Sequence, residues 1–495
     1  MKQSLASLCL VAVEIANAIS ASVRANDFYV SPHATTAGPG SKSQPCDLPT
    51  ALCGSLGRPG DTFWLRGGVY RIGHIETQIH GAAGLPITFR QMPGEHAQLV
   101  GSINIWGTAQ YVIFRDFELL SGDTNRVSRQ TGMGFNPMDV GKHVGIQSYA
   151  PNISFINLVV HDSVRSGFYT SFEATNTLIY GCIVYNTGWA SPDNAEGHSF
   201  YLQGSGEVSD NIAFNSTGAN FHLYSNGNGC FLRDLLLDGN VAFGAGELQT
   251  VRSYRDWIVG VDSPSVSADN FVLKHNMGYL APNSKTLTQV QIGRENVNGN
   301  VFLSDNYWPQ GLVLNNWTHA TVSGNVLAPQ NSDWAVELHS NLAALSASWN
   351  SNTYASLSRA GFHINSRGLN FSDWKRVTGY DSTSSSSSTG LTGTKVFVRP
   401  NRFESGRANI VIYNWDKLSK VPVNLCSALP VGSEYEVRNA EDFLSKPVRT
   451  GKFDGKPVEL PMAGLTVAKP IAPLKTPTPT GPTFNVFVLL KKASQ

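Results

Sequence analysis

The chain has 495 residues with a formal net charge of +1 at pH 7, and 41% of its residues are hydrophobic. This balance of basic and acidic residues disfavours nucleic-acid binding, which requires a basic surface excess. After the first 25 residues, no stretch has the ~18 apolar residues of a membrane-spanning helix, so we expect no membrane span in the mature chain.

The first 25 residues have the features of a secretory signal. Lys2 precedes an apolar stretch from Leu5 to Ile19, and Val23-Arg24-Ala25 forms a small-residue cleavage site. A mis-called start codon or a short core helix is the alternative, because Glu14 interrupts the apolar stretch. Removal of a signal would leave equal numbers of basic and acidic residues. We therefore expect the protein to be secreted or periplasmic.

The next segment predicts the capped start of a solenoid. A strand at Phe28–Val30 is followed by the short amphipathic run Leu48–Leu56, and Pro59-Gly60-Asp61 then turns into a further strand. A small helix over the open end of a stack of coils would keep the apolar core away from water. We expect the run at 48–56 to be this plug.

Five cysteines follow the signal segment, and their spacing is not that of a metal site. Cys46 and Cys53 flank a short segment and could pair in an oxidising compartment. Cys182 and Cys230 fit small core residues instead.

An asparagine followed by an apolar residue recurs along the middle of the chain. These pairs are Asn157-Leu158, Asn211-Ile212, Asn240-Val241, Asn276-Met277, Asn306-Tyr307 and Asn325-Val326, and Asp116-Phe117 and Cys182-Ile183 share their local frame. The spacings are too irregular for leucine-rich or ankyrin arrays. Loops of variable length on a constant core repeat predict a parallel β-helix, in which each buried asparagine can bond the asparagine one coil away.

Each coil has a second strand, and alternation predicts which of its residues point outward. A first outward column is expected from Gln147, Tyr169, Tyr201, His222, Gln291, Val313 and Glu337. A second is expected from Tyr149, Ser171, Gln203, Tyr224, Gly293, Asn315 and His339. Two long insertions, Ser121–Lys142 and Arg252–Ala268, interrupt the coils and are expected to wall a binding face.

The fold class predicted is all-β. We expect the parallel β-helix over residues 26–345, an extended final segment with a Ser-rich linker over 346–393, and a small antiparallel β domain over 394–495. The last domain contains a proline-rich excursion at Pro470–Pro482.

The segments Phe28–Pro32 and Pro59–Tyr70 resemble the N-terminal region of right-handed parallel β-helix proteins of the pectate-lyase-like superfamily. The resemblance extends over about residues 27–345. It implies a polysaccharide lyase or glycoside hydrolase that acts on an extracellular polysaccharide. Polygalacturonases are disfavoured, because Gly197-His198-Ser199 lacks the paired aspartates ahead of it. No cofactor is expected, although Ca²⁺ stays possible, since no compact aspartate cluster is evident.

The densest set of reactive side chains falls on the third and fourth coils. Candidate catalytic residues are His198, Tyr201, His222, Tyr224 and Glu247, because histidine and tyrosine can transfer protons. Candidate substrate-binding residues are Tyr169, Trp189, Asp193, Glu196, Gln203, Gln249, Arg252, Arg255, Gln291 and Arg294. Trp189 could stack on a sugar ring.

Two reactions compete for this site. In β-elimination, Arg252, Arg255 or Arg294 would neutralise a uronate carboxylate, with a histidine as base and a tyrosine as acid. Hydrolysis needs a carboxyl pair, for which the candidates are Asp193, Glu196, Glu247, Asp256 and Asp262. The lyase is slightly favoured. A non-catalytic glycan-binding surface protein is the remaining alternative, since fold does not fix function. We expect a monomer.

Overall fold

The structure is a computed structural model, and it describes residues 25–34, 38–225, 227, 231–261, 266–280, 287, 289–294, 296–329 and 334–492. The predicted signal segment lies outside the described residues except for Ala25, and Cys230 and Asp262 lie outside them as well.

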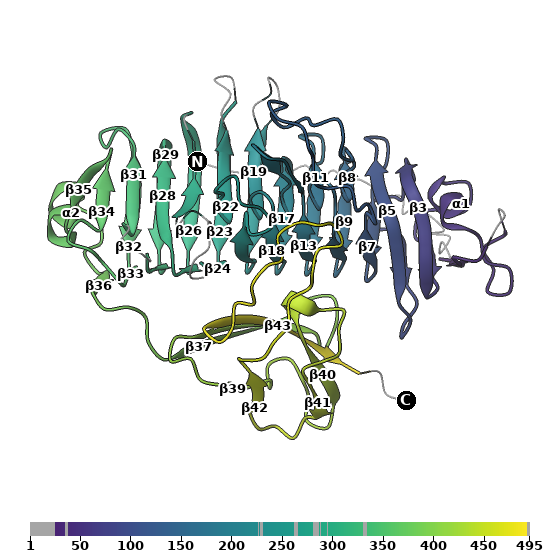
Figure 1. Ribbon diagram of the computed structural model, residues 1–495. Coiled ribbons are helices and arrows are strands. Elements are labelled where there is room, and N and C mark those ends of the chain that lie inside the picture. Colours follow the sequence, from purple (N-terminus) through teal and green to yellow (C-terminus); the bar gives the residue numbers. More distant parts are fainter. Residues whose placement is uncertain are drawn as a thin grey trace, which may run out of the picture.

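The chain winds as a right-handed parallel β-helix with three sheets along its length (Figure 1), which confirms the predicted fold class. Sheet 1 contains β1 (Asp27–Val30), β2 (Thr62–Leu65), β4 (Ile87–Gln91), β6 (Val112–Arg115), β9 (Ile153–Ile156), β12 (Thr177–Tyr180), β17 (Gly204–Ser209), β20 (Leu232–Asp238), β23 (Ala268–Lys274), β26 (Asn298–Ser304), β29 (Trp317–Ser323) and β32 (Ser346–Asn350).

The other two sheets begin at the long strands β3 (Gly68–Thr77) and β5 (Ala97–Ile105). Sheet 2 contains β7 (Glu118–Leu120), β10 (Val159–His161), β13 (Ile183–Thr187), β18 (Ile212–Ser216), β21 (Val241–Ala245), β24 (Met277–Tyr279), β27 (Tyr307–Trp308), β30 (Val326–Leu327), β33 (Thr353–Tyr354) and β36 (Ser385–Ser386). Sheet 3 contains β8 (Ile146–Ser148), β11 (Phe168–Thr170), β16 (Phe200–Leu202), β19 (Phe221–Ser225), β22 (Trp257–Val261), β25 (Gln289–Ile292), β28 (Gly311–Asn315), β31 (Val336–His339), β34 (Phe362–Ile364) and β35 (Arg367–Leu369).

In-register parallel pairing places like residues above like residues in the core. The rings of Phe200, Phe221 and Trp257 stack with centroid distances of 4.8 and 4.2 Å. All three side chains are buried. Each coil therefore adds one layer to a continuous apolar column.

The predicted asparagine ladder is confirmed, and it is longer than predicted. The side-chain amide of Asn211 donates to Oδ1 of Asn240 at 2.9 Å, and the same bond is repeated through Asn276, Asn306, Asn325 and Asn352 at 2.8 to 3.1 Å. The ladder ends where the amide of Asn352 donates to Asp381 at 3.2 Å. Each buried amide thus has a partner in the next coil.

Asn157 and Asp116 were assigned to this ladder, and that assignment is wrong by one residue. Both have positive φ, of 55° and 66°, and stand one position before the ladder. Leu158 and Phe117 occupy the ladder position there. Their backbone carbonyl groups accept hydrogen bonds from the next coil, as the backbone carbonyl group of Asn211 does. The pattern misleads because asparagine and aspartate also tolerate the left-handed conformation.

Both ends of the helix are covered. Helix α1 (Leu48–Leu52) buries Leu48, Ala51 and Leu52 over the first coil. At the other end, Trp374 of α2 (Phe371–Thr378) is buried and donates to Asp381 at 2.8 Å. Strands β32, β33, β34 and β36 continue the three sheets beyond residue 345, where the sequence analysis ended the β-helix.

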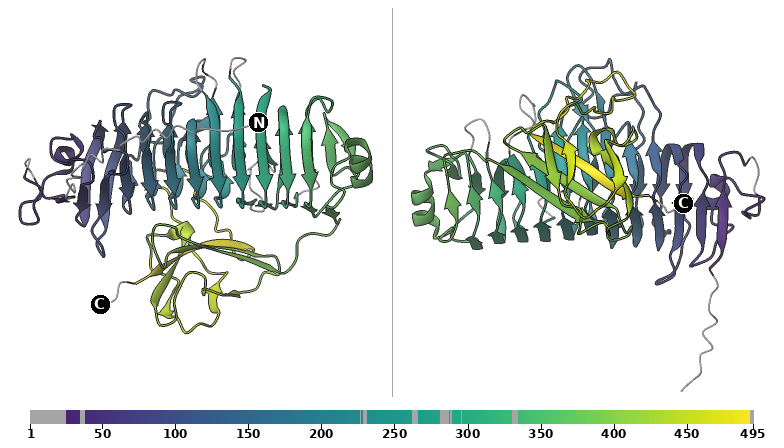
Figure 2. Two further views of the ribbon diagram at one scale, coloured as in Figure 1. Left: turned by 180° about the vertical axis from the view of Figure 1, so that it is seen from behind. Right: turned by 90° about the horizontal axis from the view of Figure 1, so that it is seen from below.

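The chain after β36 forms a small antiparallel domain below the middle coils (Figure 1). It contains a five-stranded sheet of β37 (Thr394–Pro400), β38 (Ala408–Asn414), β43 (Phe484–Lys491), β40 (Glu434–Asn439) and β41 (Arg449–Lys452), a ribbon of β39 (Lys420–Val423) and β42 (Val458–Pro461), and the short 3-10 helix η1 (Ala440–Asp442). Figure 2 shows this domain lying across the β-helix.

The domain packs on the outer face of sheet 2. Val411, Tyr413 and Phe484 join one apolar cluster with Phe214 and Tyr279 of the β-helix. This contact covers the outer side of sheet 2 at the middle coils. The outer face of sheet 3 is not part of the contact.

Candidate functional site

The first predicted outward column lies on the outer face of sheet 3 in the predicted register. Tyr169 pairs with Tyr201, and Tyr201 pairs with His222. Farther along, Gln291 pairs with Val313, and Val313 with Glu337. The sequence analysis missed one member, Ile258 of β22, which lies between His222 and Gln291. The segment Arg252–Ala268 is therefore not a simple insertion, because it contributes a strand to the sheet.

Aromatic side chains cluster on the neighbouring strands β11, β16 and β19 of this face. The ring centroids of Tyr169 and Tyr201 are 5.5 Å apart, and those of His222 and Tyr224 are 4.8 Å apart. The Arg294 guanidinium lies 5.2 Å from the ring centroid of Tyr224. Since stacked rings cover one another's faces, the edges and hydroxyl groups are what this cluster can offer to a ligand.

His222 of this cluster and the buried His198 are hydrogen-bonded in series. The backbone N–H of Ala219 donates to Nδ1 of His198 at 2.9 Å. Nε2 of His198 lies 3.1 Å from Nδ1 of His222. A backbone N–H can only donate, so neutral His198 carries its hydrogen on Nε2 and donates it to His222. The remaining nitrogen of neutral His222 must then be an N–H.

Burial keeps both imidazoles neutral. It lowers the pKa of His198 to about 4, and the pKa of His222 lies well below its ordinary value because of burial, His198 and Arg294. Burial also raises the pKa of Tyr201. At neutral pH the cluster therefore presents hydrogen-bond donors. This arrangement disfavours the predicted role of His198 or His222 as a base.

A pocket of about 330 Å³ adjoins the cluster on sheet 3, and it is lined by Gln291, Arg294, Asn315, Asn316 and His339. Arg255 is not among these lining residues; burial lowers its pKa, and the charges of Glu337 and Arg294 also affect it. Oε1 of Glu337 is 3.0 Å from Nε2 of His339. Of the predicted binding residues, Gln291 and Arg294 thus line this pocket.

Other predicted binding residues form the corner between sheets 2 and 3. Trp189 belongs to a hairpin of β14 (Trp189–Ala190) and β15 (Ala195–Glu196), and its side chain is fully buried below Arg165. The proposal that Trp189 stacks on a sugar is therefore wrong. Insertion Ser121–Lys142 covers this hairpin, and Asn194 donates to Gly134 of the insertion at 2.6 Å.

The polar residues of this corner bond mainly to the protein itself. Asp193 accepts from the backbone of Gly132 at 2.6 Å, and that bond lowers its pKa. Burial raises the pKa of Glu196, although Arg165 pairs with it at 3.0 Å. Arg252 donates to Asn194 at 2.8 Å. The amide of buried Gln249 donates to the backbone oxygen of Arg252 at 2.6 Å, and Gln203 donates to that of Tyr224 at 3.1 Å.

Two further candidate carboxylates lie away from the face. Glu247 pairs with Lys475 of the proline-rich segment at 2.8 Å, so it belongs to the contact with the C-terminal domain. Asp256 is buried inside the coils, where it accepts from Asn220 at 2.8 Å, and burial raises its pKa to about 6. Neither forms a carboxyl pair on the outer face of sheet 3, which disfavours the predicted hydrolytic arrangement.

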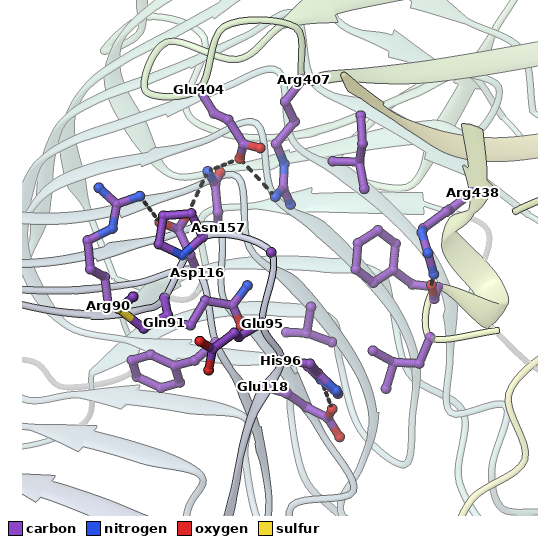
Figure 3. A pocket seen from close by; sticks show the side chains of 18 of the residues that line it. Arg90, Gln91, Glu95, His96, Asp116, Glu118, Asn157, Glu404, Arg407 and Arg438 are labelled. Carbon is purple, nitrogen blue, oxygen red and sulfur yellow. Dashed lines mark hydrogen bonds and ion pairs between the residues drawn. The ribbon is translucent and has the colours of Figure 1, made fainter. Parts of the chain in front are cut away.

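A larger pocket of about 690 Å³ lies between the first coils and the C-terminal domain (Figure 3), and the sequence analysis did not predict it. Its charged side chains pair with one another. Arg90 bonds Asp116 at 3.0 Å, and His96 lies 2.6 Å from Glu118. Figure 3 also shows Glu404 reaching Asn157, at 3.1 Å. The first two contacts lie within the β-helix and the last one joins it to the C-terminal domain, so we assign this pocket to domain docking.

The part of the chain that the structure describes contains neither a cluster of metal-ligating side chains nor a disulfide. No group of three or more His, Cys, Asp or Glu side chains there could hold a metal ion. Cys46 and Cys53, for which pairing was considered, are both free thiols. No helix among the described residues has the length and apolar character needed to cross a membrane.

Comparisons with known proteins find similarity to solved structures alone. No family model and no curated protein matches the chain. The chain is similar to a pectate lyase, with 14% identity over 70% of this chain and 82% of that one and a TM-score of 0.41. A mannuronic acid specific family 6 polysaccharide lyase from human gut microbiota is 14% identical over 70% of this chain and 78% of that one, with a TM-score of 0.38. A lacto-N-biosidase from Eubacterium ramulus is 11% identical over 74% of this chain and 68% of that one, with a TM-score of 0.41. Since these TM-scores are below 0.5, the likeness supports no statement about activity.

His339 and Glu337 are two residues of this face that the sequence analysis left out of the candidate site. Both were already placed in the outward columns. Their spacing of two residues on one strand puts both side chains on the same face, and a carboxylate beside an imidazole is a recognisable catalytic pairing. That spacing is the signal that could have identified them.

Proposed function

We propose that this protein is a carbohydrate-active enzyme that binds an acidic polysaccharide along the outer face of sheet 3 and cleaves it by β-elimination. The observation that carries this proposal is the position of Arg294. Its guanidinium lies against Tyr224, lines the adjoining pocket and acts electrostatically on His222 and Tyr201.

The face suits an extended chain of sugars. Coils repeat every ~4.8 Å, so in-register residues present similar groups along the axis. The rings of Tyr149, Tyr169 and Tyr201 follow one another at centroid distances of 6.1 and 5.5 Å. Their hydroxyl groups and the N–H of His222 can bond sugar hydroxyls in succession.

The chemistry of β-elimination supports a role for the arginines. Removal of the C5 proton of a uronate becomes easier when the charge of its carboxylate is neutralised. Arginine suits this task because its planar guanidinium binds a carboxylate through two parallel hydrogen bonds. Arg294 supplies such a group at the pocket, and no metal is needed for this step.

The test is incubation with a panel of neutral and uronate-containing polysaccharides. We expect ultraviolet absorbance from unsaturated ends only with uronates. Arg294→Gln should lower kcat/KM by about 10²-fold or more, since loss of one transition-state donor costs about that much. Arg233→Gln is the matched control, because Arg233 is an exposed arginine on sheet 1.

Two outcomes would overturn this function. New reducing ends without unsaturation would indicate a hydrolase, and binding without either product would indicate a glycan-binding protein. Chelator treatment should leave the rate unchanged, because the arginines supply the positive charge.

We also propose that the protein is secreted or periplasmic, on the basis of the N-terminal signal pattern. Expression in a host that secretes proteins, followed by N-terminal sequencing, tests this. A mature chain that still starts at Met1 would contradict it.

A further inference from the structure

We infer that His339, oriented by Glu337, is the base that removes the C5 proton. This inference rests on the proposed lyase function, and it replaces the role that the sequence analysis gave to His198 and His222.

Glu337 and His339 stand two residues apart on β31, so both point to the outer face of sheet 3. Nε2 of His339 lies 3.0 Å from Oε1 of Glu337. A carboxylate accepts a hydrogen bond, so this contact places the hydrogen of neutral His339 on Nε2. Nδ1 then has a lone pair that can take up a proton. The His339 side chain is 36% exposed, whereas that of Glu337 is 13% exposed.

His339 differs in this respect from His222. In neutral His222 the nitrogen that accepts is bonded to His198, and the other nitrogen carries hydrogen. His222 can therefore donate to a ligand but has no vacant lone pair. His339 has an accepting ring nitrogen, and it lines the same pocket of sheet 3 as Arg294.

The charged groups around Glu337 are consistent with this arrangement. His339 pairs with Glu337 directly, and the charge of Glu337 also acts on Arg255. In the next coil of sheet 3, His363 pairs with Glu337. The ring centroid of His363 lies 4.6 Å from that of Trp334. In the preceding coil the neighbour is Val313, which is uncharged. Glu337 is thus a single carboxylate among cationic or neutral groups, suited to orient an imidazole.

Arg294 and His339 line the same pocket. A uronate carboxylate held by Arg294 would place the adjacent carbon, C5, on the His339 side. Nδ1 takes the C5 proton, and the electrons of the C5–H bond form the C4–C5 double bond. The C4–O bond breaks, and its electron pair remains on the glycosidic oxygen. The imidazolium formed at His339 then returns the proton to that oxygen, so one group acts as base and then as acid.

The experiment compares the full-length protein with His339→Gln, Glu337→Gln and the control His319→Gln on a uronate polysaccharide. His319 is exposed on sheet 1, so its substitution should leave kcat and KM unchanged. We expect His339→Gln to lower kcat by about 10²-fold or more with KM nearly unchanged, since general base catalysis supplies about that factor. Glu337→Gln should lower kcat less, again without a change in KM. Thermal unfolding checks that each variant is folded.

Rescue by a small molecule separates a base from a structural role. Added imidazole should restore part of the turnover of His339→Ala and none of that of Arg294→Gln. The inference is overturned if the wild-type protein forms unsaturated product while His339→Gln keeps its kcat. It is also overturned if His339→Gln raises KM alone, or if imidazole restores nothing. If the wild-type protein forms no unsaturated product from any uronate, the proposed function fails first and this inference fails with it.

Discussion

The ring nitrogens of His198 and His222 lie 3.1 Å apart, and the backbone N–H of Ala219 determines which of them carries the hydrogen. Because Nδ1 of His198 accepts from that backbone group, Nε2 of His198 carries the hydrogen and donates it to His222. The fold therefore sets the direction of the bond between the two side chains. Two histidines that look like proton acceptors in the sequence therefore become a fixed pair of donors.

The first prediction concerns this pair of histidines. Nitrogen NMR should show the Nε2–H tautomer for His198 throughout the neutral range. Burial lowers the pKa of His198 to about 4, so its signals should not titrate between about pH 5 and 8. The exposed control His319 should be compared in the same spectra. An Nδ1–H tautomer, or titration near pH 6.5, would contradict the assigned direction.

The same shift has a consequence for stability, and its sign follows from linkage. The pKa of His198 is lower in the folded protein than its ordinary value of 6.5, so the unfolded chain binds the proton more readily. The free energy of unfolding is therefore unaffected by this group above about pH 6.5. It decreases as the pH falls from about 6.5 toward 4, because the unfolded chain takes up the proton first.

The asparagine ladder gives the second prediction. The Asn240 side chain accepts from Asn211 and donates to both Asn276 and the backbone oxygen of Val208, at 2.7 to 3.0 Å. Asn240→Ala should leave buried groups in two neighbouring coils without partners and lower the free energy of unfolding by roughly 1 to 3 kcal/mol. Denaturant unfolding measures this. Asn341→Ala at an exposed turn is the control, and an equal loss there would contradict a special role for the ladder.

The ladder also shows how far the sequence leads. Alternation along short strands is enough to place Tyr169, Tyr201 and His222 in one column, since parallel strands pair like with like. It fails at β22, because the polar residues ahead of that strand resemble a loop. It also fails for Trp189, whose burial depends on a hairpin and a distant insertion packing together. Such contacts between loops have no period in the sequence.

The direction of hydrogen bonds is a second limit. Spacing alone identifies His198 and His222 as neighbours, but it cannot reveal that the backbone of Ala219 occupies one ring nitrogen. In the same way, Glu247 looks reactive in the sequence, although the chain places Lys475 of a distant segment against it. The candidate site could therefore be located from the sequence more readily than its chemical roles.

The third prediction concerns Glu118, a buried carboxylate of sheet 2. Burial alone would raise its pKa, but hydrogen bonds from His161 and His96 outweigh burial and lower it from 4.5 to about 2. The folded state therefore stabilises the charged form of Glu118. The charged carboxylate contributes fully to the free energy of unfolding above about pH 4.5, and this contribution is lost as the pH falls toward 2.

Glu118→Gln should thus destabilise the protein at pH 7 by about 3 kcal/mol, the free energy that corresponds to this shift. The difference from the wild-type protein should shrink at low pH. Chemical denaturation at several pH values measures it. Glu459→Gln, at an exposed position of β42, is the control. A Glu118→Gln penalty that stays constant down to pH 2 would contradict the linkage.

The last prediction tests how the C-terminal domain is held on sheet 2. Arg399 of β37 bonds Asp210 and also Asp238, the latter at 3.1 Å, at the ends of two neighbouring β-helix strands. Without Arg399, two carboxylates would remain close together at a partly buried contact, and burial already raises the pKa of Asp210. Breaking a buried pair from one side costs up to about 3 to 5 kcal/mol. Since these side chains are 11 to 24% exposed, we expect a smaller loss of about 1 to 3 kcal/mol for Arg399→Ala.

Arg402→Ala is the matched control, because Arg402 pairs with Glu207 across the same contact but is 49% exposed. An exposed pair contributes at most about 1 kcal/mol, so this variant should stay near the wild-type protein. Tryptic cleavage after Lys475 reports detachment of the domain, since the backbone N–H of Lys475 is bonded to Leu248 of the β-helix in the docked state. Faster cleavage in Arg399→Ala than in Arg402→Ala is expected. Equal rates would mean that the apolar contact of Tyr413 and Phe484 with sheet 2 is sufficient to hold the domain.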